Sequence, residues 1–472
     1  MQAQDSTPRS LPRLGMTIAL TAATIGIIYG YDLGAISGAL LFLKKDLGLS
    51  TFMQEIVTSG VVAGQLLGAV AGGAVANALG RKKTMLGVAV AFAVFAALSG
   101  VAPNATFLTA ARILLGVTIG ISIVAAPLFV AESAPARIRG ALLVTYQVAT
   151  IAGIAVAYFV DLALVPTASW RWMLGLSAIP SVLIAIVVAG LPDTARWYVM
   201  RGRRDDAVAT IRRADPEVDA EREVELIEED LQHAEKGSPA ALLEPRFRKA
   251  AIFVLGLGFL IQITGINAVV YYAPTIFQSM GFKSETDSIL FPALIQVASI
   301  PSTLVALALV DRWGRRPILF TGIGAMILAD LLMMALFING KFSGATSVLG
   351  FIGILIFTMG FNFGFGATVW IYASESLPAR LRGVGASALL GMDLLANLII
   401  ALVFLSLVTS LGGAATFGIL LVLAVIAFAF INWLAPETKG RELEEIHAYW
   451  ENDARWPDAA PAARRVGRPQ PG

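Results

Sequence analysis

The sequence predicts an all-α membrane protein with 12 transmembrane helices in two repeated six-helix bundles, and three observations predict it. Hydrophobic residues make up 57% of the 472 residues and charged residues 14%, and the mean hydropathy is +0.75. Soluble globular chains do not reach that balance. The apolar residues also gather in stretches of about 20, the length that crosses a bilayer as a helix. Finally, short charged motifs occur twice, once in each half of the chain.

Twelve apolar stretches are long enough to cross a bilayer. We expect them to begin near Leu14, Ile56, Thr84, Phe107, Ala141, Trp172, Ala250, Ile289, Pro317, Ser347, Gly383 and Gly412. Between the sixth and the seventh the chain is rich in both signs of charge, which is typical of short solvated helices. The predicted regions are an N-terminal tail at 1–13, a six-helix bundle at 14–191, a central loop at 192–249, a second bundle at 250–435 and a C-terminal tail at 436–472.

Arginine and lysine predict the orientation of the spans. Basic clusters lie at 81–83, 137–139, 311–317 and 379–382 and in the central loop, and all of them fall on one side of the predicted membrane. The positive-inside rule makes that side cytoplasmic. We therefore expect a multi-pass protein of the plasma membrane with both termini and the central loop in the cytoplasm. The polar first residues precede an apolar segment too long for a signal-peptide core, so we interpret them as a retained tail.

Composition also excludes several classes of function. A net charge of +2 without a basic patch gives no indication of a nucleic-acid partner. The chain has no cysteine, and its two histidines, His233 and His447, fall in the central loop and the C-terminal tail. Neither a metal site nor the residue set of an enzyme is predicted. A channel is disfavoured because no filter of carbonyls or ring of charges is recognisable.

The repeated motifs relate the two halves to each other. ESAPARIRG at 132–140 recurs as ESLPARLRG at 375–383, in each case at the end of the fourth span of its half. ALGRKK at 78–83 is echoed by RWGRRP at 312–317, after each second span. Two related six-helix bundles that meet at a cavity in the bilayer midplane are the architecture of a transporter in which one half rocks against the other. The repeat therefore predicts transport.

One aspartate and one arginine are placed where a bilayer makes charge costly. If the first span leaves the membrane near Lys44, Asp32 lies roughly 18 Å from its outer end at 1.5 Å per residue. Arg112 follows Asn104 by about 8 residues, so it lies roughly 12 Å deep from the same side. These depths predict an ion pair that protonation of Asp32 would break. The alternative is a static pair that only holds the helices together.

Further motifs complete an ordered set that runs from Asp32 to about Glu445. They are YGYDLGAISG in the first span, RILLGVTIG in the fourth, LPDTARW at 191–197, QITGINAVVYYAP at 262–274 and PETKGRELEEI at 436–446. With the repeated loops, this set resembles the sugar porter family of the major facilitator superfamily. The resemblance implies a monomeric, proton-coupled symporter of a sugar or sugar-like polyol that works by alternating access, with no cofactor beyond the co-transported proton. The alternatives are an uncoupled facilitative transporter and a transport-inactive nutrient sensor.

The resemblance also implies roles for individual residues. Asp32 and Arg112 match the proton-coupling pair of proton symporters. The cargo site would consist of Gln147, Gln262, Asn267, Trp370, Asp393 and Asn397, with Trp370 as an aromatic plate. Gates would be formed by Tyr271 and Tyr272, and a cytoplasmic latch in the outward-open state by Arg81, Glu132, Arg139, Asp311, Arg315, Glu375 and Arg382. Gln262 and Asn267 face one cavity only if the helix breaks between them, as Gly265 permits.

The sequence departs from the family pattern in the predicted cargo site. Amide or tryptophan residues common in the family are replaced by Ile154, Ile261, Ser299 and Leu394, and Ala367 stands where the family often has proline. Asp393 stands where an amide is usual, and Asn77 where an aspartate is usual. These changes put transport of glucose or xylose in question. A more apolar sugar derivative, a polyol or a cargo with a cationic group would fit the altered site. Asp393 is alternatively a second proton site, and Asp330 is expected to face a polar crevice.

Overall fold

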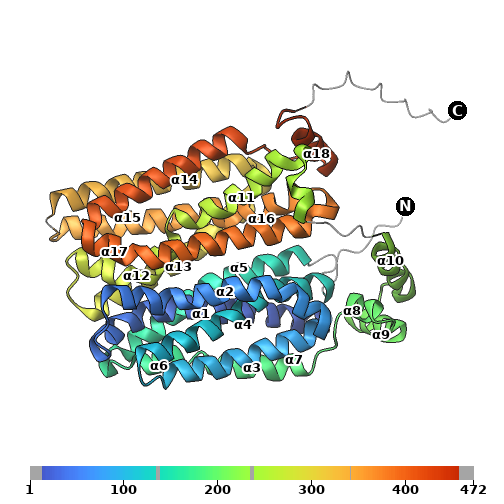
Figure 1. The fold of residues 1–472 in the computed structure, drawn as a ribbon, viewed down its shortest axis with the longest axis horizontal. Helices are drawn as coiled ribbons and strands as arrows, with labels where there is room; N and C mark the ends of the chain where they lie inside the picture. Colours follow the sequence, from blue (N-terminus) through green and yellow to red (C-terminus); the bar gives the residue numbers. More distant parts are fainter. Residues whose placement is uncertain (1–12, 134–138, 234–238, 341, 457–472) are drawn as a thin grey trace, which may run out of the picture.

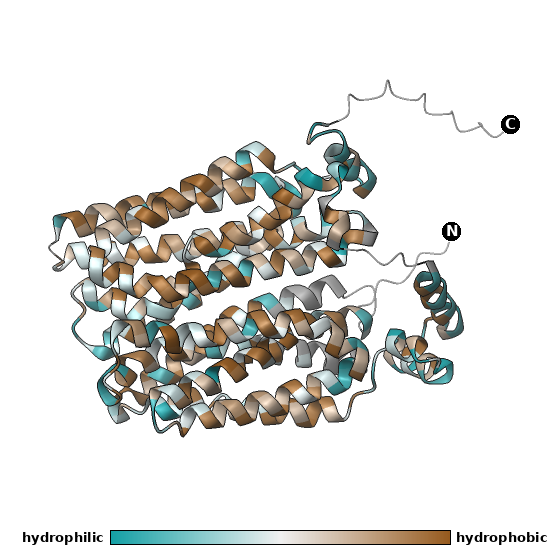
Figure 2. Cartoon of the chain, in the orientation of Figure 1, coloured by the Kyte–Doolittle hydropathy of each residue, from teal (hydrophilic) through white to brown (hydrophobic). Residues whose placement is uncertain are grey.

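The computed structural model describes residues 13–133, 139–233, 239–340 and 342–456, and within these ranges the chain forms helices and no strand. Long helices run side by side in two groups, one from the first half of the sequence and one from the second (Figure 1). Brown apolar ribbon follows their length, while teal polar ribbon gathers at their ends and in the central segment (Figure 2). The predicted all-α class with two six-helix bundles is confirmed.

The first group has six spans made of seven helices. They are α1 (Arg13–Asp46), α2 (Thr51–Leu79), α3 (Arg81–Gly100), α4 (Ala105–Ser133), α5 (Arg139–Leu164), α6 (Trp170–Gly175) and α7 (Ala178–Ala189), with a 3₁₀ turn at Val165–Thr167. The last two helices form the sixth span together, because they follow one another along Trp170–Ala189. Ser50 caps the N-terminus of α2 by accepting a hydrogen bond from the Met53 amide, which satisfies one of the first free N–H groups of that helix.

The second group is more interrupted. It contains α11 (Arg248–Ile263), α12 (Ile266–Ser279), α13 (Glu285–Trp313), α14 (Arg315–Asn339), α15 (Ala345–Phe361), a π-helical turn (Asn362–Gly366), α16 (Ala367–Glu375) and α17 (Ala379–Leu434). The seventh span breaks where α11 gives way to α12. Gly265 lies at this break with a φ of +100°, a conformation that residues with a β-carbon rarely adopt. The predicted break at Gly265 is confirmed.

Helix α17 accounts for two of the predicted spans. Within the described ranges, 11 helical segments are long and apolar enough to cross a membrane, and the last of them covers 54 residues, Leu381–Leu434. One span needs only about 20 residues. The helix is interrupted at Gly412, where φ is 81° and ψ is 166°. Gly412 is also the predicted start of the twelfth span, so the segment is an eleventh and a twelfth helix joined without a loop.

Short polar helices lie at one end of both bundles. The central segment forms α8 (Ala195–Met200), α9 (Arg204–Ala214) and α10 (Ala220–His233), followed by 3₁₀ turns at Pro239–Leu243 and Pro245–Phe247. Ala195, Ala207, Val208, Ala220 and Val224 make a small core of their own for the three helices. Helix α18 (Leu443–Glu451) lies at the same end of the bundles as α8–α10 (Figure 1). We call this end the α8 end.

Glycines bring α2 and α4 into backbone contact. Gly64 and Gly68 lie on α2, and Gly116 and Gly120 lie on α4. A β-carbon added to any of these four would lie only 2.0 or 2.1 Å from a carbonyl oxygen of the facing helix. Small residues four positions apart are a recurrent way to pack membrane helices, because lipid supplies no hydrophobic drive for helices to associate. This close packing fixes α4, which carries Arg112, against α2.

Replacement of Gly64 by alanine tests this packing. We expect Gly64→Ala to lower the apparent melting temperature of the purified protein, because its β-carbon collides with the Ile113 carbonyl at 2.0 Å, and overpacking of this kind costs about 1–3 kcal/mol. Gly73→Ala is the matched control on the same helix, since nothing lies within 4 Å of its added β-carbon. Equal melting temperatures for the two variants would contradict the packing argument.

Candidate functional site

Asp32 and Arg112, predicted to pair from their depths, lie together inside the first bundle. Asp32 on α1 is 5% exposed and Arg112 on α4 is 1% exposed. Arg112 Nη1 lies 3.5 Å from Asp32 Oδ1, while Arg112 Nε donates to the Val57 carbonyl of α2 at 3.0 Å. In the described part of the chain, Asp32 Oδ2 has no hydrogen-bond partner. The guanidinium is therefore held firmly by α2 and only loosely by the carboxylate.

A second polar group lies in the second bundle, around the break in the seventh span. Gln262 in the last turn of α11 lies next to the Asp393 carboxylate of α17 and is placed to donate to it. One turn further along α17, Asn397 Nδ2 donates to the Tyr271 hydroxyl of α12 at 3.3 Å. Asp393 is 8% exposed and Asn397 is 1% exposed. The structure thus brings together three of the six predicted cargo residues and one of the two predicted gates.

Tyr271 connects the two polar groups. It is 2% exposed, and it lies close enough to Asp32, Arg112 and Asp393 for all three charges to act on it. Its neighbour Tyr272 points elsewhere, because its hydroxyl donates to the Ala401 carbonyl of its own bundle at 2.8 Å. Tyr271 therefore contacts the predicted cargo site and lies within electrostatic reach of the predicted proton pair.

The other predicted cargo residues lie apart from this hydrogen-bonded group. Gln147 on α5 and Asn267 at the start of α12 are half-buried, and Trp370 on α16 is 43% exposed. Among the described residues, none of the three side chains hydrogen-bonds to Gln262, Asp393 or Asn397. Their roles in cargo binding remain predictions.

At the end opposite the α8 end, hydrogen bonds join the two bundles. Both Glu55 carboxylate oxygens on α2 accept from Ser406 on α17, one from its amide at 2.6 Å and one from its hydroxyl at 2.7 Å. The Ser37 and Tyr158 hydroxyls donate to the Val270 carbonyl of α12 at 2.8 and 2.7 Å. An exposed ion pair, Lys45 with Glu285, crosses the same seam. These contacts close this end of the molecule.

At the α8 end, each bundle has its own charge network, and the two networks correspond residue for residue. In the first, Glu132 accepts from Arg81 at 2.8 Å and from the Thr194 hydroxyl at 2.6 Å. In the second, Glu375 accepts from Arg315 at 3.2 Å and from the Thr438 hydroxyl at 2.6 Å. The acid before each threonine, Asp193 or Glu437, accepts the backbone amides of the corresponding arginine and of the residue after it.

The predicted latch residues therefore pair within bundles in this structure. Asp311 is 80% exposed at its side chain and pairs with Arg315 of its own bundle at 3.0 Å. Arg382 Nε has no hydrogen-bond partner among the described residues, and the side chain of Arg139 lies outside them. A latch between bundles in the outward-open state stays a prediction. Among the described residues, hydrogen bonds cross the seam at one end and pair only within bundles at the other, which is the arrangement of a transporter open at its α8 end.

Two further buried acids lie outside these groups. Asp330 on α14 is 0% exposed, and neither of its carboxylate oxygens has a partner among the described residues; the polar crevice expected around it is not found there. Asp161 on α5, which sequence reasoning missed, is also 0% exposed and packs against Gly38 of α1, where an added β-carbon would meet its Oδ2 at 2.3 Å. No role for Asp161 could be read from a single acid near the end of a span.

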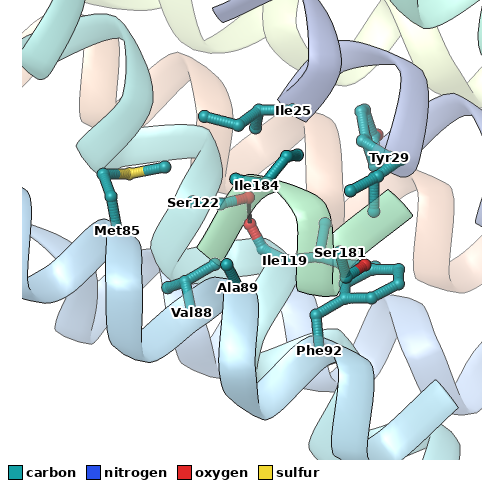
Figure 3. A pocket seen from close by; sticks show the side chains of 11 residues that line it. Ile25, Tyr29, Met85, Val88, Ala89, Phe92, Ile119, Ser122, Ser181 and Ile184 are labelled. Carbon is teal, nitrogen blue, oxygen red and sulfur yellow. Dashed lines mark hydrogen bonds between the residues drawn. The ribbon is translucent and has the colours of Figure 1, made fainter. Parts of the chain in front are cut away.

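A small pocket inside the first bundle is not the predicted cargo site. Figure 3 shows it among α1, α3, α4 and α7, with none of the predicted cargo residues in its wall. Its lining is mostly apolar. The two serine hydroxyls in it, Ser122 and Ser181, donate to carbonyls of their own helices at 2.7 and 2.8 Å. Both hydroxyl protons in the pocket are therefore already used in hydrogen bonds and are not available to a polar cargo.

Several residues in the charge networks and at the seam escaped sequence reasoning. Thr194 and Thr438 each follow an acid just after the last span of a half, in LPDTARW and PETKG. That shared acid–threonine pair was the available signal. Glu55 and Ser406 gave no such signal, because their contact joins segments 351 residues apart.

Two six-span bundles, a buried charge pair and a polar group beside a broken helix define a secondary transporter. Comparison with known proteins agrees. The sequence model of the family described as "Sugar (and other) transporter" matches residues 18–450. The chain is 34% identical over 439 residues to a galactose-proton symporter of Escherichia coli K12, covering 93% of this chain and 95% of that one. It is 32% identical to an arabinose-proton symporter of Bacillus subtilis, covering 92% and 94%.

Solved structures of transporters share the fold of this chain. A xylose transporter from E. coli in its inward-open conformation matches with a TM-score of 0.79 at 24% identity, over 92% of this chain and 99% of that one. A proton:xylose symporter bound to 6-bromo-6-deoxy-D-glucose matches with a TM-score of 0.74 at 25% identity, over 93% and 99%. The chain belongs to the sugar transporter family of the major facilitator superfamily, a family of multi-pass membrane transporters.

The closed seam gives a testable prediction. We expect Glu55→Gln to open this end more often, because it weakens two hydrogen bonds to a buried carboxylate, each worth about 1.5–3 kcal/mol. The native chain has no cysteine, so Val270→Cys can report on opening through its rate of labelling by an impermeant maleimide on that side of the membrane. The rate should rise several-fold.

Glu285→Gln is the matched control for this measurement. It removes the exposed ion pair with Lys45 on the same seam, and such pairs contribute little. Labelling that is unchanged by Glu55→Gln, or raised equally by both substitutions, would show that the Glu55–Ser406 contact does not hold this end closed.

Proposed function

We propose that this protein is a proton-coupled symporter of a sugar or sugar-like polyol that works by alternating access. The observation that carries the proposal is the buried Asp32–Arg112 pair, in which one carboxylate oxygen has no partner among the described residues. Relatives spanning nearly the whole chain are named as proton symporters of galactose and arabinose. A buried acid beside an arginine is the arrangement that lets one proton change the local charge balance.

The pair can act as a proton-operated connection between α1 and α4. When Asp32 is ionised, its attraction to Arg112 ties α1 to the α2–α4 unit, which the glycine contacts make rigid. When Asp32 is protonated, that attraction falls away, while Arg112 keeps its hydrogen bond to the Val57 carbonyl. Protonation therefore releases α1 from Arg112, while α4 stays attached to α2. Because α1 also contacts α12 through Ser37 and Val270, this release weakens the seam between the bundles.

The contacts at the two ends support a rocking motion. The polar contacts of the seam opposite the α8 end are a few hydrogen bonds to the Val270 carbonyl and the Glu55 carboxylate and one exposed ion pair, which a rigid rotation of one bundle can break together. At the α8 end, the Glu132 and Glu375 networks hold each bundle together without crossing the seam. In this arrangement the cargo enters and leaves the site from the α8 end, which we place in the cytoplasm with both termini, in the plasma membrane.

The polar group in the second bundle is suited to a hydroxylated cargo. Gln262 Oε1 and Asn397 Oδ1 have no hydrogen-bond partner among the described residues. Buried polar atoms left unpaired are costly, so a cargo that donates to them is favoured over an empty site. Gln147 and Asn267 add half-buried amides, and the exposed face of Trp370 supplies a surface for sugar C–H groups. The transporter is proposed to act as a monomer and to need no cofactor beyond the proton.

Asp32→Asn tests proton coupling. The amide cannot exchange the proton, so we expect proteoliposomes with the variant to lose uphill accumulation of cargo while they retain exchange of cargo across the membrane. The measurement is labelled-sugar uptake with and without an inward proton gradient, followed by counterflow. Asp46→Asn is the matched control on α1, because Asp46 lies in the last turn and pairs with Arg171 at an exposed site. Gradient-driven accumulation by Asp32→Asn would place the proton site elsewhere, whereas uptake by the native chain that ignores the gradient would make it an uncoupled transporter.

Trp370→Ala tests the cargo site independently of the proton. We expect a several-fold rise in the KM for cargo with little change in counterflow at saturation, because aromatic contacts contribute about 0.5–1.5 kcal/mol beyond area burial. Trp433→Ala is the matched control, since Trp433 is 69% exposed at the end of α17. An unchanged KM in Trp370→Ala would remove this residue from the cargo site.

A further inference from the structure

The polar group around Asp393 contains hydrogen-bond acceptors that lack donors. An ionised carboxylate only accepts hydrogen bonds, so Gln262 must turn its NH₂ group toward Asp393. The Gln262 Oε1 is then left over, and it has no partner among the described residues. Asn397 directs Nδ2 at the Tyr271 hydroxyl, and its Oδ1 is likewise without a partner there. Three acceptor groups therefore share one site.

These acceptors lie close together. Asp393 and Asn397 are four residues apart on α17, so they lie on one face of the helix with β-carbons about 5–6 Å apart. Gln262 reaches the same point from α11, because it contacts Asp393 directly. Asn397 is 1% exposed and Asp393 is 8% exposed, so water solvates neither freely. The three groups can converge on a single ligand atom.

Among the described residues, no positive charge balances Asp393. No lysine or arginine there forms an ion pair with it, and the polar side chain placed to donate to it is Gln262. The buried guanidinium of the first bundle, Arg112, is already committed to Asp32 and the Val57 carbonyl. Arg382, on the same helix as Asp393, lies about 16 Å away along the helix axis. A buried carboxylate without a counter-charge is costly, and the cost falls when a cation binds beside it.

A cationic cargo supplies the hydrogen-bond donors that the acceptors lack and the positive charge that Asp393 lacks. An ammonium group carries three N–H donors and a positive charge, which matches three acceptors and one unbalanced carboxylate. A neutral sugar hydroxyl supplies one donor and no charge. We propose that this transporter selects an aminated sugar or aminocyclitol in its ammonium form, with the amine bound among the Asp393 carboxylate, Gln262 Oε1 and Asn397 Oδ1. This inference rests on the proposed function, since it names the cargo class of the same site.

The test compares amine and hydroxyl at one position of otherwise identical sugars. Proteoliposomes with the full chain and an inward proton gradient are given 2-amino-2-deoxyglucose, 6-amino-6-deoxyglucose or glucose as labelled cargo. A charged hydrogen bond is worth enough to change affinity at least about tenfold. We therefore expect one amino sugar to have a KM at least about tenfold below that of glucose, and its N-acetyl derivative, which has no charge, to lose this advantage.

Asp393→Asn should then remove the preference, because it keeps the shape of the side chain and deletes its charge. The KM values for the amino sugar and glucose should converge. Asp330→Asn is the matched control: it neutralises another buried acid of the second bundle, which lies outside this site, and should preserve the preference. The comparison of sugars is made first on the native chain, so it does not depend on the folding of a variant.

Three outcomes would overturn the inference. Glucose that is transported as well as either amine by the native chain would show that the acceptors do not select a cation. A preference that survives Asp393→Asn would place cation recognition elsewhere. Loss of gradient coupling with retained preference in Asp393→Asn would make Asp393 a proton site. In the first two cases gradient-driven glucose uptake would leave the proposed function standing, whereas no gradient-driven uptake of any sugar in the panel would remove both proposals.

Discussion

The structure depends on one constraint: inside a bilayer a polar group must find its partner within the protein, because lipid offers none. Most buried polar groups here comply, as Arg112 does with Asp32 and Val57, and as Glu55 does with Ser406. The groups that do not comply are therefore informative. Among the described residues, oxygens of Asp32, Gln262 and Asn397 lack hydrogen-bond partners, and these are the places where we propose that the proton and the cargo bind.

Rigid bundles and a weak seam follow from the same constraint. Helices inside a bundle meet through backbone contacts, such as those of Gly64 and Gly116, and these contacts tolerate no added atom. The bundles meet through apolar side chains and through hydrogen bonds such as those of Glu55 with Ser406, which a rotation of one bundle can break. At the α8 end, Glu132 and Glu375 complete their networks within a bundle, so that end can separate without leaving a carboxylate unpaired. Alternating access thus needs only the seam to change.

Sequence reasoning succeeded where position along a helix was enough. Depth along two spans predicted the meeting of Asp32 with Arg112, and the glycine between Gln262 and Asn267 predicted the broken helix. It failed where a contact depended on the rotation of a helix about its own axis. Span length says nothing about rotation, so the burial of Asp161 against Gly38 and the contact of Glu55 with Ser406 were out of reach. The latch arginines were recognised as charged partners, but partner choice within a bundle depends on tertiary geometry.

Tyr271 gives the two polar groups a way to influence each other. Its hydroxyl accepts a hydrogen bond from Asn397 in the cargo group and lies within electrostatic reach of both Asp32 and Arg112. Protonation of Asp32 leaves Arg112 as an unbalanced positive charge within electrostatic reach of that hydroxyl, which attracts the hydroxyl oxygen toward the arginine and weakens its acceptance from Asn397 Nδ2. A cargo that occupies Asn397 Oδ1 changes the same bond from the other side. Thermodynamic linkage then requires that the two effects are equal. If proton binding raises the affinity for cargo by some factor, cargo binding raises the affinity for the proton by the same factor.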